Sequence, residues 1–290
     1  MVTACGRFDF ATIARTDGSS IDTSDSTLES TCTGSGVFST PQPVTAANTT
    51  ATQYGSSISP DGLTLLYDQS NSSADERIYI STRASRTDDF PTPIELNLGA
   101  AVGQNDSDAS LSTDNLDLYF YSSRAGSCIY HAHRTTIDDA FGTADKLSAT
   151  CGANATSGPA ITADGLALAY NTSTDTYGEG TIYITTRATP TDDFTLGAPA
   201  QGVDNPAGYP WLSSDQKRIY YEHKTNAGFE LRFAQRTDPT GAFDTPIAMT
   251  DLNIADNVVD IGMTADESIA VMSIQKTDNF DIYIATRPCL

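Results

Sequence analysis

Hydrophobic residues occur along this chain in runs of three to five, and segments rich in Ser, Thr, Asp and Gly separate the runs. Within many runs, apolar and polar residues alternate. This pattern predicts many short strands rather than a few long helices. No apolar run approaches the ~18 residues that a transmembrane helix needs. We therefore expect an all-β fold.

A turn motif centred on an Asp recurs along the chain, first as Pro60-Asp61-Gly62. Its Asp returns at positions 114, 164, 215 and 266, so successive spacings are 53, 50, 51 and 51 residues. Each unit contains a strand before the turn, a strand after it, a third strand that ends in Arg, and a fourth that follows a Phe. A period near fifty residues in all-strand units predicts the blades of a β-propeller.

The number of blades follows from the two ends of the chain. Complete units run over about 54–106, 107–156, 157–206 and 207–257, and a fifth at 258–290 lacks its fourth strand. A spare fourth strand, Val37–Val44, lies near the N-terminus. We predict a five-bladed propeller at 37–290 with four-stranded blades, the last closed by the N-terminal strand, which leaves no open sheet edge. Residues 1–36 are expected to form an N-terminal extension.

The cysteines fit this arrangement. Cys128 and Cys151 fall within one blade, and Cys32 and Cys289 both align with the turn that the chain ends interrupt. We predict a disulfide in each pair, and such bonds persist in oxidising compartments. Cys5 stands in a Val-Thr-Ala-Cys-Gly segment that resembles the end of a bacterial lipoprotein signal; a free thiol is the alternative. We expect an exported bacterial protein that is periplasmic, anchored in the outer membrane, or secreted.

The chain is strongly acidic, with 37 Asp and Glu against 16 Lys and Arg and a formal charge of -21. This sign argues against nucleic acid as a partner. Solubility is one explanation for the acidity, and Ca²⁺ binding by oxygen-rich loops is another. Such loops lie at Gln104–Asp108, Asp204-Asn205 and Asp256-Asn257. His131 and His133 share a strand face without an evident third metal ligand, and no G-x-S-x-G or P-loop motif occurs.

Three elements of the repeat carry a family resemblance: LSxDG before an aliphatic-aromatic strand, then IYxATR, then DxF. Together they resemble the TolB-type, WD40-like (PD40) β-propeller repeats of secreted and periplasmic bacterial proteins, over residues 37–290. The resemblance implies a rigid disc used for binding or scaffolding. We expect the Arg that ends each third strand to pair with Asp residues of the following turn. The Arg residues are Arg83, Arg134, Arg187, Arg236 and Arg287, and the Asp residues are Asp88, Asp139, Asp192 and Asp238.

Three positions in each unit should face the propeller axis, and they differ from blade to blade. Seven residues after the turn Asp stand Asp68, Tyr121, Asn171, Glu222 and Ser273. Six before it stand Gly55, Asp108, Gly158, Tyr209 and Asp260, and four before it stand Ser57, Ser110, Ala160, Trp211 and Gly262. A purely structural repeat should be uniform here. We therefore predict a binding site formed by Trp211, Tyr209, Asp108, Asp260, Glu222, Asp68, Tyr121 and Asn171.

An aromatic side chain beside carboxylates is typical of sites for sugars and cations; Trp211 as core filling of the channel is the alternative. We interpret the chain as a monomeric, non-catalytic propeller that binds a glycan, peptide or protein at its axial face, without a cofactor apart from possible Ca²⁺. One alternative is a glycoside hydrolase that uses Asp108, Glu222 and Asp260. Another is an interaction module whose axial face stays empty.

Overall fold

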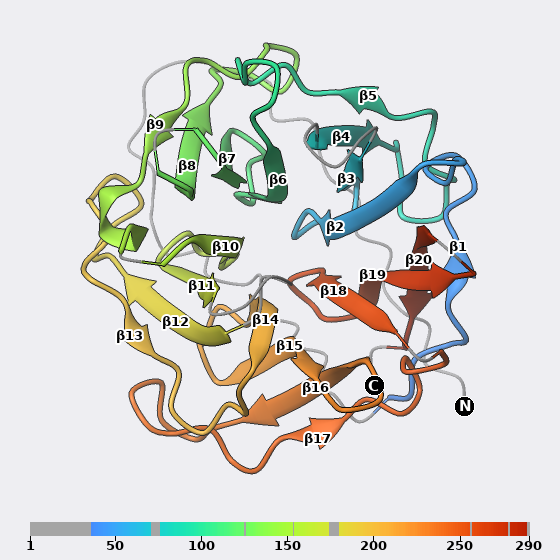
Figure 1. Ribbon diagram of the computed structural model, residues 1–290, viewed down its shortest axis with the longest axis vertical. Coiled ribbons are helices and arrows are strands. Elements are labelled where there is room, and N and C mark those ends of the chain that lie inside the picture. The colour runs from blue at the N-terminus through green and yellow to red at the C-terminus, as the bar shows by residue number, and fades with distance from the viewer. Residues whose placement is uncertain are drawn as a thin grey trace, which may run out of the picture. The chain divides into compact units, whose positions relative to one another are not determined.

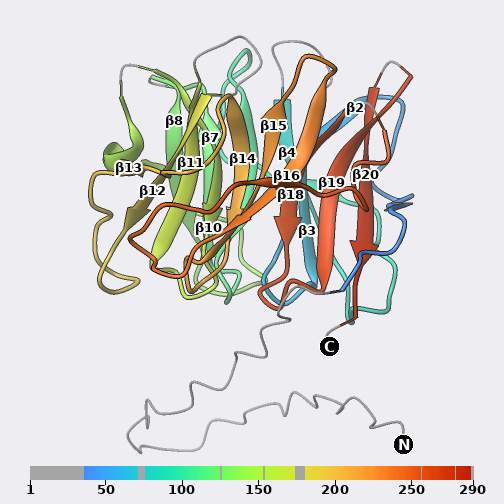
Figure 2. The same ribbon diagram turned by 90° about the horizontal axis from the view of Figure 1, so that it is seen from below.

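The computed structural model describes residues 36–70, 76–124, 126–152, 154–173, 180–255, 257–277 and 279–288. The chain divides into two units, 1–30 and 31–290, and the first lies outside the described residues. The second is a ring of antiparallel sheets around a central axis (Figure 1). Each blade has four strands, and the pairing of Gly180 with Ala207 joins the third and fourth blades into one eight-stranded sheet. Seen from the side, the ring is a disc whose depth is set by the length of its strands (Figure 2). No helix among the described residues is long and apolar enough to cross a membrane.

The strands of each blade follow one another from the axis outward. Blade I is β2 (Thr52–Ile58), β3 (Thr64–Ser70), β4 (Glu76–Thr82) and β5 (Ile94–Glu95). Blade II is β6 (Asp106–Leu111), β7 (Asp117–Ser122), β8 (Cys128–His133) and β9 (Asp145–Lys146), followed by a 3₁₀ turn, η1 (Ser148–Thr150). Blade III is β10 (Thr156–Ile161), β11 (Ala167–Ser173), β12 (Gly180–Thr186) and β13 (Ala198–Pro199).

Blade IV is β14 (Ala207–Leu212), β15 (Arg218–Lys224), β16 (Phe229–Gln235) and β17 (Ile247–Ala248). Blade V is β18 (Val258–Met263), β19 (Ile269–Lys276), β20 (Asn279–Thr286) and β1 (Gln42–Pro43). Apolar side chains from neighbouring blades pack into shared clusters, such as Ile78 of blade I with Leu111 and Leu118 of blade II. The hydrophobic core of the propeller therefore lies between the blades.

The predicted closure of the ring is confirmed. β1 pairs antiparallel with β20, with Gln42 opposite Ile284, and the two strands lie side by side in Figure 1. Beyond the paired residues, the Ser39 amide donates to the Thr286 carbonyl at 2.7 Å. The Arg287 guanidinium lies 4.5 Å from the centre of the Phe38 ring. The two ends of the folded chain therefore hold blade V together through hydrogen bonds and a cation–π contact.

The predicted pairing of the repeated Arg residues with Asp carboxylates is wrong. Each Arg instead donates from Nε to a carbonyl in the turn between the first two strands of its blade, at 2.7–3.0 Å. Each guanidinium also lies 4.2–4.5 Å from the ring centre of the fourth-strand Phe. Arg83 reaches Asp88 only through the backbone carbonyl of that residue. The Arg therefore ties three strands of a blade together, a role that an exposed Asp carboxylate would not provide.

The turns that lack Gly keep the same conformation as those that have it. Asn115, Gln216 and Glu267 adopt φ values of 60°, 56° and 55°, close to the 70° of Gly165. The turn Asp stabilises this conformation, since its Oδ1 accepts the amide two residues later, as in the 2.9 Å bond from Leu63 to Asp61. The substitutions therefore add backbone strain without changing the turn.

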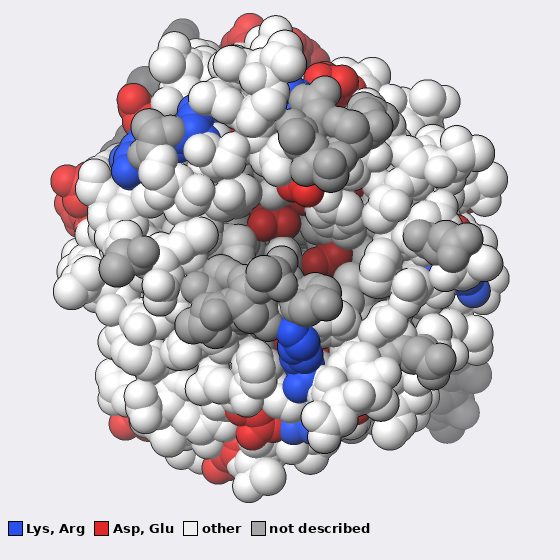
Figure 3. Space-filling view, viewed as in Figure 1, with Lys and Arg blue, Asp and Glu red and all other residues white. Residues whose placement is uncertain are grey.

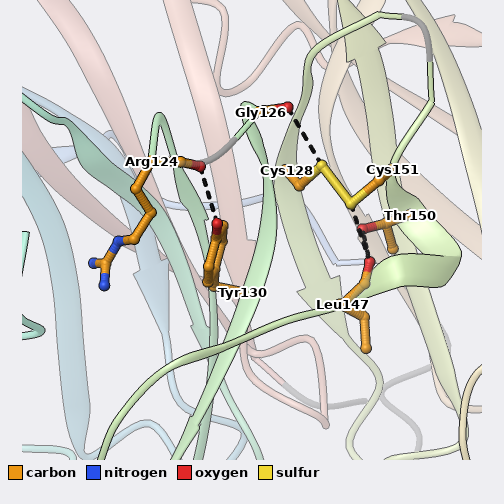
Figure 4. The surroundings of a disulfide bond; sticks show 7 residues. All are labelled: Arg124, Gly126, Cys128, Tyr130, Leu147, Thr150 and Cys151. Carbon is orange, nitrogen blue, oxygen red and sulfur yellow. Dashed lines mark hydrogen bonds between the residues drawn. A yellow bond between two sulfur atoms is a disulfide. The ribbon is translucent and has the colours of Figure 1, made fainter.

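The predicted bond between Cys128 and Cys151 is present, and it joins β8 to the segment after η1, with Cα atoms 5.4 Å apart (Figure 4). It fastens the outer part of blade II to the connection that leads to blade III. Cys5, Cys32 and Cys289 lie outside the described residues, so the predicted disulfide between Cys32 and Cys289 and the predicted lipidation at Cys5 stay predictions.

Candidate active site in the axial channel

Each innermost strand contains a β-bulge six residues before the turn Asp. The register of every first pair of strands shifts at this point. The bulged residues adopt positive φ angles of 46–63°, and they are Gly55, Asp108, Gly158, Tyr209 and Asp260. Only two are Gly, so three blades hold a side chain in a conformation that side chains disfavour. The bulge releases the residue's amide from its own sheet, which leaves it available to the preceding blade.

A closed ring of hydrogen bonds uses these released amides. In three blades the acceptor is the second-strand side chain seven residues after the turn Asp. Asp68 accepts from the Asp108 amide at 2.6 Å, and Asn171 accepts from the Tyr209 amide at 3.1 Å. Glu222 accepts from the Asp260 amide at 3.0 Å. Each of these bonds joins one blade to the next.

In blades II and V the bulged residue itself supplies the acceptor. The second-strand positions there are Tyr121 and Ser273. Asp108 Oδ2 accepts the Gly158 amide at 3.4 Å, and Asp260 Oδ2 accepts the Gly55 amide at 2.7 Å. Every blade thus contributes one acceptor side chain. It stands either on the second strand, seven residues after the turn Asp, or at the bulge, six residues before it. This exchange explains much of the blade-to-blade variation from which a ligand-binding site was predicted.

Four of the five ring acceptors are carboxyl groups from which water is almost excluded. The exposed fractions of Asp68, Asp108, Glu222 and Asp260 run from 0% to 7%. Burial, together with the charge of Asp260, raises the pKa of Asp108 to about 7. Burial raises the pKa of Asp260 to about 6, against the opposing effect of the hydrogen bond from the Gly55 amide. Burial also raises the pKa of Asp68 well above its usual value.

The axial channel is narrow and is lined by residues of all five innermost strands. Its volume is about 50 Å³, which is enough for one or two water molecules and too small for a sugar ring. Viewed along the axis, the molecule is hollowed at its centre, where Asp and Glu atoms show on the walls (Figure 3). A ligand larger than water would therefore have to sit at the mouth of the channel.

The structure separates the predicted site residues into three groups. Asp108, Asp260, Tyr209 and Trp211 line the channel. Asp68, Glu222 and Asn171 are buried and do not line the channel; they act as ring acceptors. Tyr121 is half-buried and is not a channel-lining residue.

Trp211 has features of both roles that the sequence left open. It lines the channel, and its ring packs edge-on against the buried Tyr220 with ring centres 5.7 Å apart. It also contacts the apolar cluster between blades IV and V. Trp211 therefore closes part of the channel and at the same time belongs to the core.

Two half-buried residues near this site were not predicted from the sequence. The Tyr54 hydroxyl on β2 donates a hydrogen bond to Glu76 Oε1, at the start of β4. Burial raises the pKa of Glu76. Tyr54 occupies a column of the repeat that otherwise holds Ser107, Ser157, Gly208 and Val259. One aromatic among small or aliphatic residues is the signal that could have identified it.

The candidate metal ligands are engaged with protein groups. Asp117 Oδ1 contacts His131 Nε2 at 2.6 Å and His133 Nδ1 at 3.0 Å. In the loops considered for Ca²⁺, Asp106 forms an ion pair with Arg124, and Asp204 forms one with Arg232; Asp256 lies outside the described residues. Across the described part of the chain, no group of three or more His, Cys, Asp or Glu is arranged to hold a metal ion.

The similarity of this chain to known proteins lies in its fold. No family model matches the chain, and no curated protein matches its sequence. The solved catalytic domain of the GH62 α-L-arabinofuranosidase of Coprinopsis cinerea is similar in fold, with a TM-score of 0.58 at 9% identity over 87% of this chain and 97% of that one. The GH43_1 enzyme of Xanthomonas citri, solved with xylotriose, gives 0.57 at 14% identity over 85% and 89%.

TolB from Acinetobacter baumannii is also similar, with a TM-score of 0.50 and 17% identity over 84% of this chain, which spans 56% of that protein. At such identities the similarity shows a propeller fold and does not confirm the PD40 family. It corrects the interpretation of the chain as a non-catalytic binding or scaffold module. That interpretation assumed a fold used for binding, whereas glycoside hydrolases are prominent among the matched propellers.

Proposed function

We propose that this protein is a glycoside hydrolase that acts on a glycan at the mouth of the axial channel. The observation that supports this most is the pair of channel-lining carboxyls, Asp108 and Asp260, with pKa values near 7 and near 6. Two carboxyl groups that titrate on either side of the working pH are what hydrolysis of a glycosidic bond requires. The fold, shared with arabinofuranosidases and other glycoside hydrolases, is consistent with this chemistry.

Asp108 is the proposed general acid, since at pH 6–7 a large share of its carboxyl is protonated. It gives its proton to the glycosidic oxygen as the bond from that oxygen to the anomeric carbon breaks. Asp260, which is largely ionised above pH 6, accepts the proton of the water whose oxygen bonds to the anomeric carbon. Products are then the freed sugar hydroxyl and the hydrolysed sugar, and one proton has moved from Asp108 to Asp260. No metal or other cofactor is needed.

Gly55 lies next to both carboxyls. Its amide donates to Asp260 Oδ2 at 2.7 Å, and Asp108 Oδ1 lies 3.2 Å from the point that a Cβ on Gly55 would occupy. That Cβ would also fall 1.8 Å from Asp68 Oδ2. Only Gly leaves room for three carboxyls at this position. Glu222 acts as a positioning residue, because it holds the amide of Asp260.

The proposed function carries several finer proposals. We propose that residues 37–290 form the catalytic propeller and that residues 1–36 are an extension with a lipidation site at Cys5. The similarity to TolB and to glycan-degrading enzymes supports a PD40-type repeat and a location outside the cytoplasm. The proposed partner is therefore a glycan rather than a protein or peptide.

Hydrolysis of arabinoxylan, xylotriose, cellotriose and their 4-nitrophenyl glycosides tests the function. Asp108→Asn and Asp260→Asn keep an acceptor oxygen for the ring, as Asn171 does in blade III, so both variants should fold. Each should lose about 10²–10⁴-fold in kcat on the natural linkage. Asp108→Asn should lose less on the nitrophenyl glycosides, because that leaving group needs little protonation.

Asp145→Asn, on the exposed outer strand β9, is the matched control and should keep full activity. Absence of turnover by the wild type on every substrate would contradict the proposal. Unchanged turnover in both ring variants would contradict the assigned roles.

A further inference from the structure

The interface between blades I and II carries polar groups that the ring of hydrogen bonds does not use. On blade I, Tyr54 pairs in register with Asp68, and Ser70 pairs with Glu76. Because cross-strand partners point to the same face of a sheet, Tyr54, Asp68 and Glu76 all face blade II. From blade II, Asn105 Oδ1 accepts a hydrogen bond from the backbone amide of Glu76 at 3.2 Å. The backbone of Glu76 is thus bonded to blade II, and its side chain is bonded to Tyr54 of its own blade.

Some carboxyl oxygens at the interface between blades I and II accept fewer hydrogen bonds than they could. Among the described residues, Asp68 Oδ1 and Asp106 Oδ1 are buried without a hydrogen-bond partner, and both belong to this interface. Glu76 commits one of its two oxygens to Tyr54, although a carboxylate can accept about four hydrogen bonds. Buried acceptors that lack partners are costly. Asp68 Oδ1 and Asp106 Oδ1 are out of reach of a ligand, so a ligand would place its donors on the second oxygen of Glu76.

The charges around the site restrict the kind of ligand. Glu76 is close enough to Asp108 for its charge to raise the pKa of the proposed acid. The residues that line the channel include no Lys, Arg or His. Arg124 lies at the same interface, but its charge is paired with Asp106. The surplus of carboxyl groups around Glu76 therefore favours a ligand rich in hydroxyl donors over an acidic sugar. Tyr54 and Glu76 are both half-buried, and neither lines the channel itself, so the proposed ligand lies beside the channel on the blade I–II side.

We propose that Glu76, oriented by Tyr54, is a specificity-determining residue that binds neighbouring hydroxyl groups of a neutral sugar on the blade I–II side of the channel mouth. This inference rests on the proposed function, since it locates one sugar of the substrate beside Asp108. The Tyr54 hydroxyl donates to one Glu76 oxygen and keeps the other turned to the ligand. Glu76 thus governs affinity, and Asp108 governs turnover.

The same blade contains a matched control. Tyr79 on β4 donates from its hydroxyl to Glu95 Oε2 on β5 at 3.4 Å, and this pair is exposed at the outer edge. Glu95→Gln therefore makes the same chemical change as Glu76→Gln, at a Tyr–Glu pair remote from the axis. Any effect of net charge on binding should appear in both variants.

Binding of xylotriose and cellotriose, measured by isothermal titration calorimetry, tests the inference. Glu76→Gln should weaken binding by about tenfold or more, because a hydrogen bond to a charged group is stronger than one to an amide. Tyr54→Phe should weaken it less, and Glu95→Gln and Asp108→Asn should bind as the wild type does. On hydrolysed substrates, Glu76→Gln should raise KM and, because it removes a charge that helps to raise the pKa of Asp108, shift the pH dependence of kcat to lower pH, whereas Asp108→Asn should lower kcat across the pH range. Thermal unfolding of each variant confirms that it is folded.

The outcomes separate the two proposals. Wild-type binding without turnover would refute the hydrolase and support the sugar site. Turnover with an unchanged KM in both Glu76→Gln and Tyr54→Phe would refute the sugar site and leave the hydrolase. Absence of wild-type binding to either oligosaccharide, or equal losses in Glu76→Gln and Glu95→Gln, would also overturn the inference.

Discussion

The buried carboxyls of Asp108 and Asp260 should make the propeller lose stability as pH rises. Their pKa values in the folded protein are about 7 and about 6, above the 3.8 of an unperturbed Asp. A carboxyl with a raised pKa binds its proton more tightly in the folded state. Its stabilising contribution is therefore fully present below pH ~4 and is lost as pH rises through 6 and 7.

The magnitude follows from the two shifts. Each pH unit corresponds to about 1.4 kcal/mol, so Asp260 accounts for about 3 kcal/mol and Asp108 for about 4 kcal/mol between pH 4 and pH 8. Their mutual repulsion is part of the larger shift, so together we expect about 5 kcal/mol. The Asp108→Asn/Asp260→Asn double variant stays neutral at every pH and keeps the acceptor oxygens. It should lack this loss.

Urea unfolding, followed by the fluorescence of the single Trp211, gives the free energy of unfolding at half-unit steps from pH 4 to pH 8. Urea is uncharged and leaves the electrostatics intact. The variant and the wild type should be equally stable at pH 4 and differ by about 5 kcal/mol at pH 8. Other groups that titrate in this range contribute to both curves; Asp68, whose pKa is raised in part by the charges of Asp108 and Asp260, adds to the difference in the same direction. Parallel curves would show that folding does not raise the pKa values of these two carboxyls. That result would also refute the assignment of Asp108 as a general acid.

Two further changes test the ring itself. Phe38→Ala removes the aromatic partner of Arg287 at the junction of the two chain ends, and should destabilise the protein by about 3–5 kcal/mol; a change below 1 kcal/mol in urea unfolding would argue that the junction is held by hydrogen bonds alone. Cys151→Ser removes the cross-link to Cys128, which spans 23 residues, and should cost about 3 kcal/mol; equal unfolding midpoints of wild type and variant, with the wild-type disulfide verified by mass, would contradict this.

The architecture could be predicted because it repeats. A turn Asp recurs about every fifty residues, the unit at 258–290 is unfinished, and a spare strand ends at Val44. These features predict that the spare strand completes the last blade and closes the ring, and the structure shows this closure. The bond from Cys128 to Cys151 followed from the same alignment. Each of these inferences needed only the place of a residue within its repeat unit, and aligning the units by their period gives that place.

Contacts between blades were harder to predict. The partner of each repeated Arg was misassigned because an Asp nearby in sequence seemed a natural counterion, whereas the turn carbonyl and the Phe ring are brought close only by folding. That Asp68, Asn171 and Glu222 accept hydrogen bonds from the next blade was not predicted either. Asp68 meets an amide 40 residues away, and nothing local in the sequence indicates which amides the bulges release.

The inter-blade bonds also have a direction, and it is the same in all five: every donor belongs to the blade that follows its acceptor around the axis. The ring of hydrogen bonds therefore has no first or last blade. Because the five bonds point around a closed ring, their dipoles nearly cancel. A blade could be added to or removed from this ring by gene duplication or loss, provided that it has one amide that is not bonded within its own sheet and one acceptor side chain. The acceptor can come from either of two neighbouring strands, so the residue at the other position can differ from blade to blade.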